Sequence, residues 1–557
     1  MNRRRAGNFS PGPYENGFSV ISSRSVTPYE AEEFTPREAD ILRRYFTNLD
    51  QPVFALVNLP EVVKGALFAR YSRTAKSLRR LFLDEFLDEL DVSGDESVDA
   101  TTGMRRAEEL YDRVFFQYGD DSVAQLGGVH LACEQASNVL TKILEWGRIM
   151  SYLEQSTRYI RYDQRSGGRY RYFRDPDVLN SSLGTRYVGE IDRMFDIYSD
   201  LIPVMEQFFK DAVPKKTTDA DIAYKMAIRA KALDSIRGLL PAASFSNVGI
   251  YGSGQAYEAL LLRMRASGLP EARDYSNLML TELRKVIPSF LKRVDLADRG
   301  QVTSKYLSDN ASAMDEVSER LLDVSGDPAT ESSVDLVDFD PDAEVKLVTA
   351  MLYPTSPLSE REIVDQVHKM TVDERLSVIK AYVGDRTNRR HRPGRALERI
   401  DYRFDVLGDY GSFRDLQRHR MCTIEWQRLS TRHGYVMPDV IDMVRKTAQY
   451  TDVMQRSADL HDSLAEEFPE QAPYAVALAY RMRYSMQMNA RSAMHILELR
   501  STPQGHPTYR SVAQDMHRLI ADRAGHKAVA EMMLFVDHSA DADLERLNSE
   551  NKAASRT

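Results

Sequence analysis

A short run of cationic side chains is the part of this sequence best suited to chemistry. Residues 418–420 read Arg-His-Arg, and residues 428–432 read Arg-Leu-Ser-Thr-Arg. A guanidinium group donates hydrogen bonds in a fixed fork that matches two oxygens of a phosphate or carboxylate. The pattern therefore favours a site for an anionic ligand that accepts hydrogen bonds.

A second group of such residues lies near the end of the chain, where residues 489–500 read Asn-Ala-Arg-Ser-Ala-Met-His-Ile-Leu-Glu-Leu-Arg. If this segment is helical, Arg491 and His495 lie one turn apart and come close enough to Asn489 to line one wall of a groove. A salt-bridged surface helix would have the same spacing, so the spacing alone does not separate the two interpretations.

The first half of the chain contains a stretch similar to the first of these. Residues 146–159 follow the plan of residues 418–432: Gln155 matches Gln427, and the Ser-Thr-Arg that follows recurs after a two-residue insertion in the later stretch. So short a match could recur by chance in an arginine-rich chain. A true internal repeat, however, implies two folding units, and this hypothesis precedes any other about the fold.

Composition limits the class of protein. A chain of 557 residues exceeds what one hydrophobic core usually supports, so two or three domains are expected. The 74 Lys and Arg against 83 Asp and Glu give a net charge of −9, which makes nucleic acid an unlikely partner. The two cysteines, Cys133 and Cys422, cannot build a disulfide framework or a cysteine-based zinc site, so no metal is expected and both should be buried.

The sequence contains no signal for export or membrane insertion. The N-terminus has a basic start without the apolar run of a secretory signal, and no run of about 18 apolar residues occurs. We expect a soluble, cytoplasmic protein with no membrane association.

Changes in composition divide the chain. Ser-, Pro- and Gly-rich residues 1–35 predict a disordered tail, and the acidic stretch 325–344 has no basic residue and predicts a linker. The expected parts are a tail at 1–35, a first copy at 36–324, the linker at 325–344, a second copy at 345–540 and a polar tail at 541–557.

The two copies are predicted to be helix-rich α+β domains. Helical apolar spacing dominates both, and no strand-linked glycine fingerprint of a dinucleotide-binding fold appears. Two local features suggest strands: residues 158–174 suit a hairpin that turns at Gly167 and Gly168, and the apolar residues 346–352 suit a buried strand. The cations and aromatics of 158–174 could also stack on and grip a nucleic acid, a role that the acidic whole disfavours.

At the arginine-rich stretches the sequence resembles the flavin-dependent thymidylate synthases, whose signature is Arg-His-Arg, seven residues and then Ser, within Arg-His-Arg-x-x-Ser-x-Asn-Glu-x-Ser-x-Arg-Tyr. The second copy keeps Arg-His-Arg at 418–420, but Arg428 stands where the serine belongs and Thr423 where an earlier serine belongs. The first copy has Trp146-Gly147 in place of Arg-His. It keeps six other family positions: Arg148, Ser151, Glu154, Ser156, Arg158 and Tyr159.

The same division holds outside the motif. The family's Arg-x-x-Leu-Pro survives as residues 237–241 of the first copy, and the second copy has lost it near residues 471–478. The second copy keeps Glu398 and the segment 489–500. The first copy replaces the Asn and Arg of that segment with Ser253 and Gln255.

One family residue is missing from both copies. A glutamine that precedes Arg-His-Arg by three residues in the family is Asp415 in the second copy and Ile143 in the first. Its absence weakens the uracil recognition that the resemblance would otherwise imply.

The resemblance implies an activity. In the family, reduced FAD supplies a hydride, methylenetetrahydrofolate supplies a one-carbon unit, and C5 of dUMP accepts it without a cysteine nucleophile, with NADPH as the reductant. Each family site is built from several subunits of a homotetramer, so a homodimer of this chain would form a pseudo-tetramer. Composite sites would combine the residues that each copy has kept, and the remaining sites would be inactive.

The residues carried over by resemblance fall into three sets. Those expected in catalysis are Ser156, Arg418 and Arg420. Those expected to hold the cofactor are His419, Arg420, Glu398, Asn489, Arg491 and His495. Those expected to hold the substrate are Glu154, Ser156, Arg158, Arg237 and Arg500. Because His419 lies between two arginines, it should resist protonation.

Two alternatives remain open. The chain could bind flavin and nucleotide but make a different product, for instance by hydroxymethylation of a pyrimidine. It could also be a divergent homologue that binds a nucleotide or flavin without turnover, or a scaffold.

Overall fold

The computed structural model describes residues 32–50, 54, 56–71, 76–87, 125–217, 219–323 and 325–539. The chain divides into two compact units, Met1–Tyr118 and Gly119–Thr557. The tails predicted at 1–35 and 541–557 fall outside the described residues, apart from residues 32–35.

The described part of the smaller unit is helical. It contains α1 (Pro36–Tyr45), α2 (Glu61–Tyr71) and α3 (Leu78–Glu85). Thr35 and Glu38 form a capping box that begins α1. The rings of Phe46 and Phe82 meet edge to face at 5.4 Å in the core of this unit.

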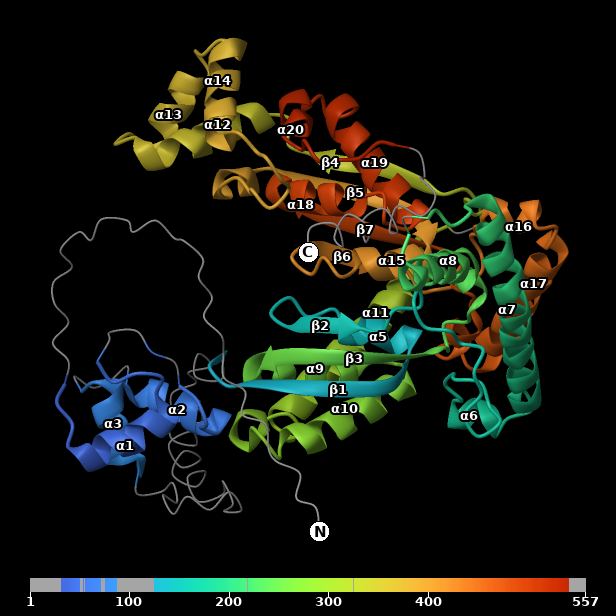
Figure 1. Cartoon of the computed structure of the whole chain (residues 1–557), viewed down its shortest axis with the longest axis horizontal. Coiled ribbons are helices and arrows are strands. Elements are labelled where there is room, and N and C mark those ends of the chain that lie inside the picture. The colour runs from blue at the N-terminus through green and yellow to red at the C-terminus, as the bar shows by residue number, and fades with distance from the viewer. Residues whose placement is uncertain are drawn as a thin grey trace. The chain divides into compact units, whose positions relative to one another are not determined.

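The larger unit begins with a three-stranded antiparallel sheet in the order β1-β3-β2. Helices α9 and α10 pack against it (Figure 1). Its elements are β1 (Gly128–Ser137), α5 (Asn138–Leu144), β2 (Ser151–Glu154), α6 (Pro176–Leu179), α7 (Gly184–Ala212), α8 (Asp221–Ile236), η4 (Arg237–Leu239), β3 (Phe245–Ser253), α9 (Gly254–Ala266), α10 (Pro270–Leu283), η5 (Pro288–Leu291) and α11 (Gly300–Leu321).

A four-stranded antiparallel sheet follows, in the order β4-β5-β7-β6. Its strands are β4 (Ser333–Phe339), β5 (Asp401–Asp409), β6 (Thr423–Trp426) and β7 (Arg481–Asn489). The helices of this part are α12 (Ala343–Leu352), η6 (Tyr353–Thr355), α13 (Glu360–Val367), α14 (Val372–Val383), η7 (Arg395–Arg399), α15 (Tyr410–Leu416), α16 (Asp439–Met443), α17 (Thr447–Glu467), η8 (Ala472–Ala475), α18 (Ala490–Arg500), α19 (Pro507–Asp522) and α20 (Lys527–Glu531).

The same order of elements occurs twice in the larger unit. The series β1-α5-β2 recurs as β5-α15-β6, and β3-α9-α10 recurs as β7-α18-α19. The match of Gln155 with Gln427 is structural as well, because each backbone N–H donates to an equivalent strand carbonyl, Asn247 and Arg483 respectively, at 2.9 Å. The repeat seen in the sequence is therefore also a repeat of backbone geometry.

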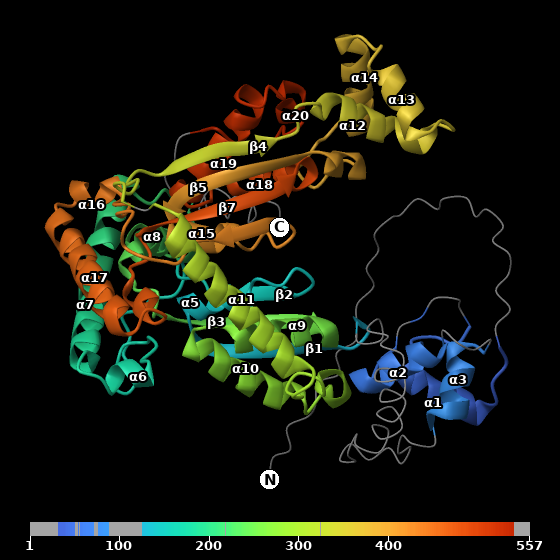
Figure 2. The ribbon, with the colours of Figure 1, turned by 180° about the vertical axis from the view of Figure 1, so that it is seen from behind.

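The two copies meet about an approximate twofold axis. Pro241 of the first copy forms a β-bridge with Ala477 of the second. On either side, Ala242 N–H donates to the Val476 carbonyl at 2.8 Å, and Leu478 N–H donates to the Leu240 carbonyl at 2.9 Å. Helices α7 and α17 pack together beside this junction (Figures 1 and 2). Both copies therefore belong to one compact unit.

The structure differs from the sequence interpretation at two segments. The expected linker at 325–344 contains β4, which pairs with β5, so this part is the edge of the second sheet. Residues 346–352, expected as a buried strand, belong to α12. A short apolar run fits a buried helix as well as a strand, and only its neighbours decide between them.

Of two further expectations, one is confirmed in part and one is confirmed. The chain turns at Gly167 and Gly168, both with positive φ, between the bridged Ser166 and Arg169, but residues 158–174 form no strand, so only the turn of the expected hairpin is present. Cys133 and Cys422 are buried and form no disulfide. Within the described ranges, no helix is long and apolar enough to cross a membrane.

Candidate functional site

A cavity of about 570 Å³ brings together every residue expected to hold the cofactor. We call it the arginine cavity. Its lining residues are Arg392, Arg395, Glu398, Arg418, His419, Arg420, Met421, Cys422, Asn489, Arg491, Ser492, His495 and Ile496. Five guanidinium groups against one carboxylate make it strongly cationic, which suits an anionic ligand.

The second sheet and its helix position one wall of this cavity. Asn489 ends β7 and caps α18, its Oδ1 accepting a hydrogen bond from Ser492 N–H at 2.9 Å. Arg491 follows in the first turn and donates to Glu398 Oε1 at 3.1 Å and to the Pro393 carbonyl at 3.0 Å. These contacts hold Arg491 at the cavity wall, and Glu398 acts there as a partner of arginine.

His419 links the arginine cavity to the interior. Arg500 Nε donates a hydrogen bond to His419 Nε2 at 2.8 Å. Burial, with Arg500 and His495 nearby, lowers the pKa of His419 well below its ordinary value. The predicted resistance to protonation is confirmed, but its chief cause is burial; the neighbouring Arg418 contributes less. Burial and Arg392 also lower the pKa of His495, to about 4.

The first copy contributes a fully buried carboxylate beneath Arg418. Glu154 accepts from Arg414 at 2.7 Å and Arg418 at 2.9 Å, and its other cationic neighbour is Lys142 at 3.3 Å. Burial alone would raise the pKa of Glu154, but the three cations hold it well below its ordinary range. These cations fix Glu154 beneath Arg418, and its expected contact with the substrate stays a prediction.

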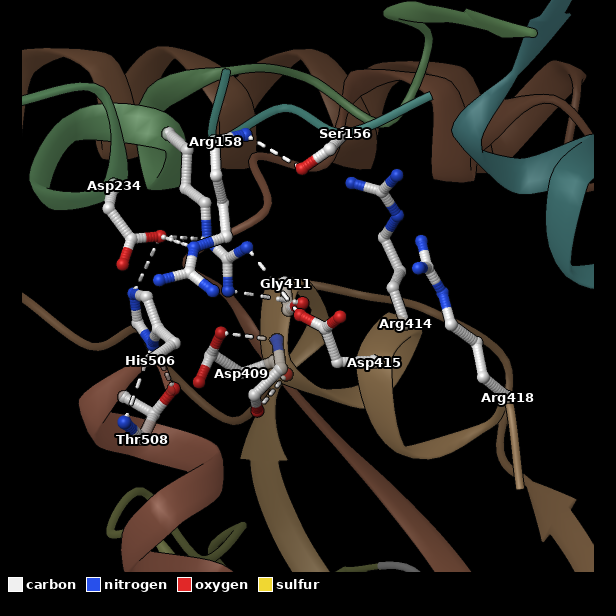
Figure 3. A network of polar contacts seen from close by, with 12 residues as sticks. Ser156, Arg158, Asp234, Asp409, Gly411, Arg414, Asp415, Arg418, His506 and Thr508 are labelled. Atoms are coloured by element: carbon white, nitrogen blue, oxygen red, sulfur yellow. Dashed lines mark hydrogen bonds and ion pairs between the residues drawn. The ribbon is translucent and has the colours of Figure 1, made fainter. Parts of the chain in front are cut away.

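Three of the residues expected to hold the substrate converge on two acids. Arg158, Arg237 and Arg500 surround Asp234 and Asp415, and these five residues form what we call the arginine–aspartate network. Figure 3 labels three of them, Arg158, Asp234 and Asp415. Arg158 lies 3.0 Å from Asp234, Arg237 lies 3.6 Å from Asp415, and Arg500 lies 3.8 Å from Asp415. Residues from both copies therefore build one cluster.

The arginines govern the ionisation of the acids in this network. Burial would raise the pKa of Asp415, but Arg237 and Arg500 lower it to about 2. The pKa of Asp234 is also lowered, against its burial, by His506, Arg237 and Arg158. Both side chains are carboxylates at neutral pH and already engage the arginines expected to bind phosphate.

Of the two remaining predicted residues, Ser156 lies beside the arginine–aspartate network and Arg420 lies at the arginine cavity. Ser156 is half-buried, and its Oγ accepts a hydrogen bond from Arg158 N–H at 3.3 Å (Figure 3). Arg420 lines the arginine cavity and donates to Ser151 Oγ of the first copy at 3.3 Å.

Sequence reasoning missed several charged residues of the site. Asp234 lies in α8 and His506 caps α19, neither with a motif. Arg392 lies in the loop before η7, Arg395 begins η7, and Asp415 was noted only as a lost glutamine. The density of arginine at residues 386–399 was the available signal for Arg392 and Arg395.

The twofold axis gives this site a twin of different chemistry. The axis relates the pair of Arg420 and Ser151 to the pair of Arg148 and Thr423, in which Arg148 donates a hydrogen bond to Thr423 Oγ1 at 2.9 Å. The axis relates the ion pair of Arg418 and Glu154 to Trp146 and Trp426, whose ring centroids lie 5.5 Å apart. An aromatic contact therefore replaces the ion pair in the twin.

The fold and the site together define an α+β protein whose two related halves share an arginine-rich site. Residues 69–289 and 335–524, more than half of the chain, match the family described as "Thymidylate synthase complementing protein". The chain belongs to this family. The match in two regions fits the repeated order of elements.

Several proteins are similar to this chain along most of its length. A UPF0159 protein of Chlamydia pneumoniae is 41% identical over 528 residues, covering 93% of this chain and 98% of that protein. A UPF0159 protein of Thermoplasma acidophilum is 29% identical over 514 residues, covering 87% and 97%.

Two further similarities are partial. A flavin-dependent thymidylate synthase of Clostridium tetani is 24% identical over 183 residues, covering 32% of this chain and 67% of that protein. A solved structure of the UMP/dUMP methylase PolB from Streptomyces cacaoi, bound with 5-Br dUMP, covers 36% of this chain and 96% of its own, with 18% identity and a TM-score of 0.28.

Proposed function

We propose that this protein transfers a one-carbon unit from methylenetetrahydrofolate to C5 of dUMP, giving dTMP, with FAD as cofactor and NADPH as reductant. One observation carries the proposal. The residues expected to hold the cofactor line one cavity, those expected to hold the nucleotide phosphate converge beside it, and the 2.8 Å contact of Arg500 with His419 joins the two groups.

The donor set of the arginine cavity fits FAD. Guanidinium groups suit the two phosphates, and the neutral His419 and His495 can lie against a ring system without placing a cation there. The bound flavin would supply the hydride. Asn489 and Glu398 would fix its orientation through Arg491 and the start of α18.

The arginine–aspartate network fits the phosphate of the nucleotide. The three arginines Arg158, Arg237 and Arg500 carry one positive charge more than the two carboxylates of Asp234 and Asp415. A bound phosphate would accept hydrogen bonds from arginine N–H groups that now bind these carboxylates. Ser156 would orient the ligand from the neighbouring turn. Arg418, held by Glu154, and Arg420 would stabilise negative charge that develops on the pyrimidine.

The cysteines support a mechanism without a thiolate. Burial raises the pKa of Cys133 and of Cys422 to about 12. Cys422 lines the arginine cavity, yet its thiol stays protonated at neutral pH and is a poor nucleophile there.

The twin site supports one active site for each pair of copies. In the twin site the rings of Trp146 and Trp426 meet where the other site has its ion pair, so this charged partner for a nucleotide or flavin is missing. Arg428 forms an ion pair with Glu470 at 3.0 Å. A homodimer of this chain would then form a pseudo-tetramer with half of the sites active. Light scattering would test this assembly as twice the chain mass of 63.5 kDa.

A second candidate rests on Asp415. A carboxylate in the place of the family glutamine, bound to two arginines, would change how a pyrimidine ring is recognised. This favours a homologue that modifies a pyrimidine differently, such as by hydroxymethylation, or that binds flavin and nucleotide without catalysis.

The visible spectrum of the purified protein tests the proposal first. Flavin bands near one per chain, perturbed by dUMP, would support both ligands in adjacent sites, and assays would then follow dTMP formation. Arg491→Ala should lose flavin, and Ser156→Ala should retain flavin but make no dTMP. Full activity in both variants, or no flavin after incubation with excess FAD, would overturn the proposal.

A further inference from the structure

We propose that a second cavity binds a neutral, planar heterocycle whose ring edge presents adjacent N–H donors. This junction cavity has a volume of about 510 Å³ and lies where the two copies meet. Polar side chains on it include Lys231, Asp234, Arg237, Asp409, His506 and Thr508. Its apolar wall includes Phe208, Phe209, Val436, Met437, Val440 and Met443.

Asp409 has a hydrogen-bond acceptor that the protein leaves unused. Its side chain ends β5 and caps α15, because Oδ1 accepts from Ser412 N–H at 2.8 Å. Only 6% of Asp409 is exposed, and its buried Oδ2 has no hydrogen-bond partner. Asp409 lines the cavity beside His506 and Thr508 (Figure 3). Buried polar atoms are normally satisfied, so an unsatisfied carboxylate oxygen at a cavity wall points to a donor on a ligand.

The twin of this position shows how the same place is filled when no ligand is needed. Ser137 caps α5 as Asp409 caps α15. Ser137 Oγ donates to Glu271 at 2.6 Å, and Tyr474 Oη donates to the same carboxylate at 2.8 Å. Three protein side chains thus satisfy one another, and all three are buried.

The junction cavity lacks both of the groups that close its twin. Tyr474 corresponds across the twofold axis to Gly238, which has no side chain to fill the space. Glu271 is the second residue of α10, and the second residue of α19 is the shorter Thr508, which contacts His506 at 2.8 Å. The open volume and the unused acceptor therefore have one cause, the replacement of two side chains.

The lining selects the chemistry of the ligand. A carboxylate only accepts hydrogen bonds, so the ligand must donate. Lys231 and Arg237 offset two of the three carboxylates on the same cavity, those of Asp234, Asp409 and Asp439, so the lining carries little net charge and suits neutral N–H groups. The apolar wall suits a flat ring, and the volume fits a bicyclic molecule. The amide-and-amine edge shared by guanine and pterins meets all of these requirements.

Isothermal titration of the full chain with guanosine and, separately, with a simple pterin tests this proposal. We expect one of them to bind, and Asp409→Asn to weaken that binding about 10- to 100-fold. Asn keeps an oxygen for the cap of α15 but turns an N–H group toward the ligand, so the variant should fold normally. Asp439→Asn, an exposed carboxylate on the same cavity, should bind as the wild type does.

Three results would overturn the proposal: no binding of either probe, equal binding by Asp409→Asn, or displacement of the probe by dUMP. The last would make the cavity part of the nucleotide site. Asp234 and Arg237 belong both to this cavity and to the arginine–aspartate network, so the two proposals share residues. Asp409→Asn changes neither of them, and binding is measured without turnover, so failure of probe binding is distinguishable from loss of dTMP formation.

Discussion

Replacing Glu154 by Gln should be among the most damaging single changes in this protein. The carboxylate is fully buried and neutralises Arg414 at 2.7 Å and Arg418 at 2.9 Å. The described part of the chain offers Arg414 no other acidic side chain within ion-pair distance, whereas Lys142 keeps Glu145 at 2.8 Å. Gln keeps the shape and one oxygen, but it removes the charge that holds Arg414 in the interior.

The cost follows from the burial of Arg414, of whose side chain 4% is exposed. Removing one partner of a buried ion pair destabilises a protein by about 3–5 kcal/mol, because the other charge is left uncompensated. The oxygen of Gln preserves one hydrogen bond to Arg414, so we expect about 3 kcal/mol. Arg418 should also lose its fixed position, with weaker flavin binding as a consequence.

Glu145→Gln is the matched control. Glu145 is equally buried and contacts Lys142, but burial raises its pKa, the opposite direction to the shift of Glu154, so its charge contributes less to the stability of the fold. Gln keeps the shape of Glu145, and Lys142 retains Glu154 at 3.3 Å, so the cost of Glu145→Gln should be about 1 kcal/mol or less. Both variants replace a buried Glu by Gln, so they differ in the ion pairs that are lost and hardly in side-chain size or burial.

Urea unfolding at pH 7 measures both variants. The pH dependence of the free energy of unfolding also separates the variants. The pKa of Glu154 is lowered in the folded protein, so its stabilising contribution is present above its ordinary pKa and is lost as the pH falls through the folded value. The difference in stability between wild type and Glu154→Gln should therefore shrink in acid. Equal costs for Glu154→Gln and Glu145→Gln, or a cost below about 1 kcal/mol for Glu154→Gln, would refute this reasoning.

Three further predictions concern the site. Asp415→Gln removes the carboxylate that competes for Arg237 and Arg500, so dUMP should bind about tenfold more tightly in titrations; weaker binding would show that Asp415 contacts the ligand. The wild type should bind one flavin per chain, measured by absorbance after denaturation, because Trp146 and Trp426 close the twin site; two per chain would contradict this. The pKa of His419 is lowered, so the folded protein resists its protonation and the free energy of unfolding should fall as the pH drops below about 6.5. His419→Gln should reduce that slope by about 1.4 kcal/mol per pH unit, and an unchanged slope would assign it to another group.

The sequence allowed the repeat and the cationic character of the site to be predicted, because both depend on short-range patterns. Gln155 and Gln427 occupy equivalent backbone positions, and the turn at Gly167 and Gly168 follows from residue type. The edge strand β4 was missed because its acidic residues resemble a linker, although charged residues on an edge strand are a usual protection against aggregation.

Residue types along the chain were thus enough to define an arginine-rich, duplicated α+β protein, since periodicity and motif spacing are local properties. Which charges meet was decided only by the tertiary structure. Asp234 and Asp415 come together because antiparallel pairing about Pro241 and Ala477 folds one copy onto the other. The same junction leaves Asp409 facing an open cavity, since that depends on which side chains lie across the twofold axis, a relation that no local pattern encodes.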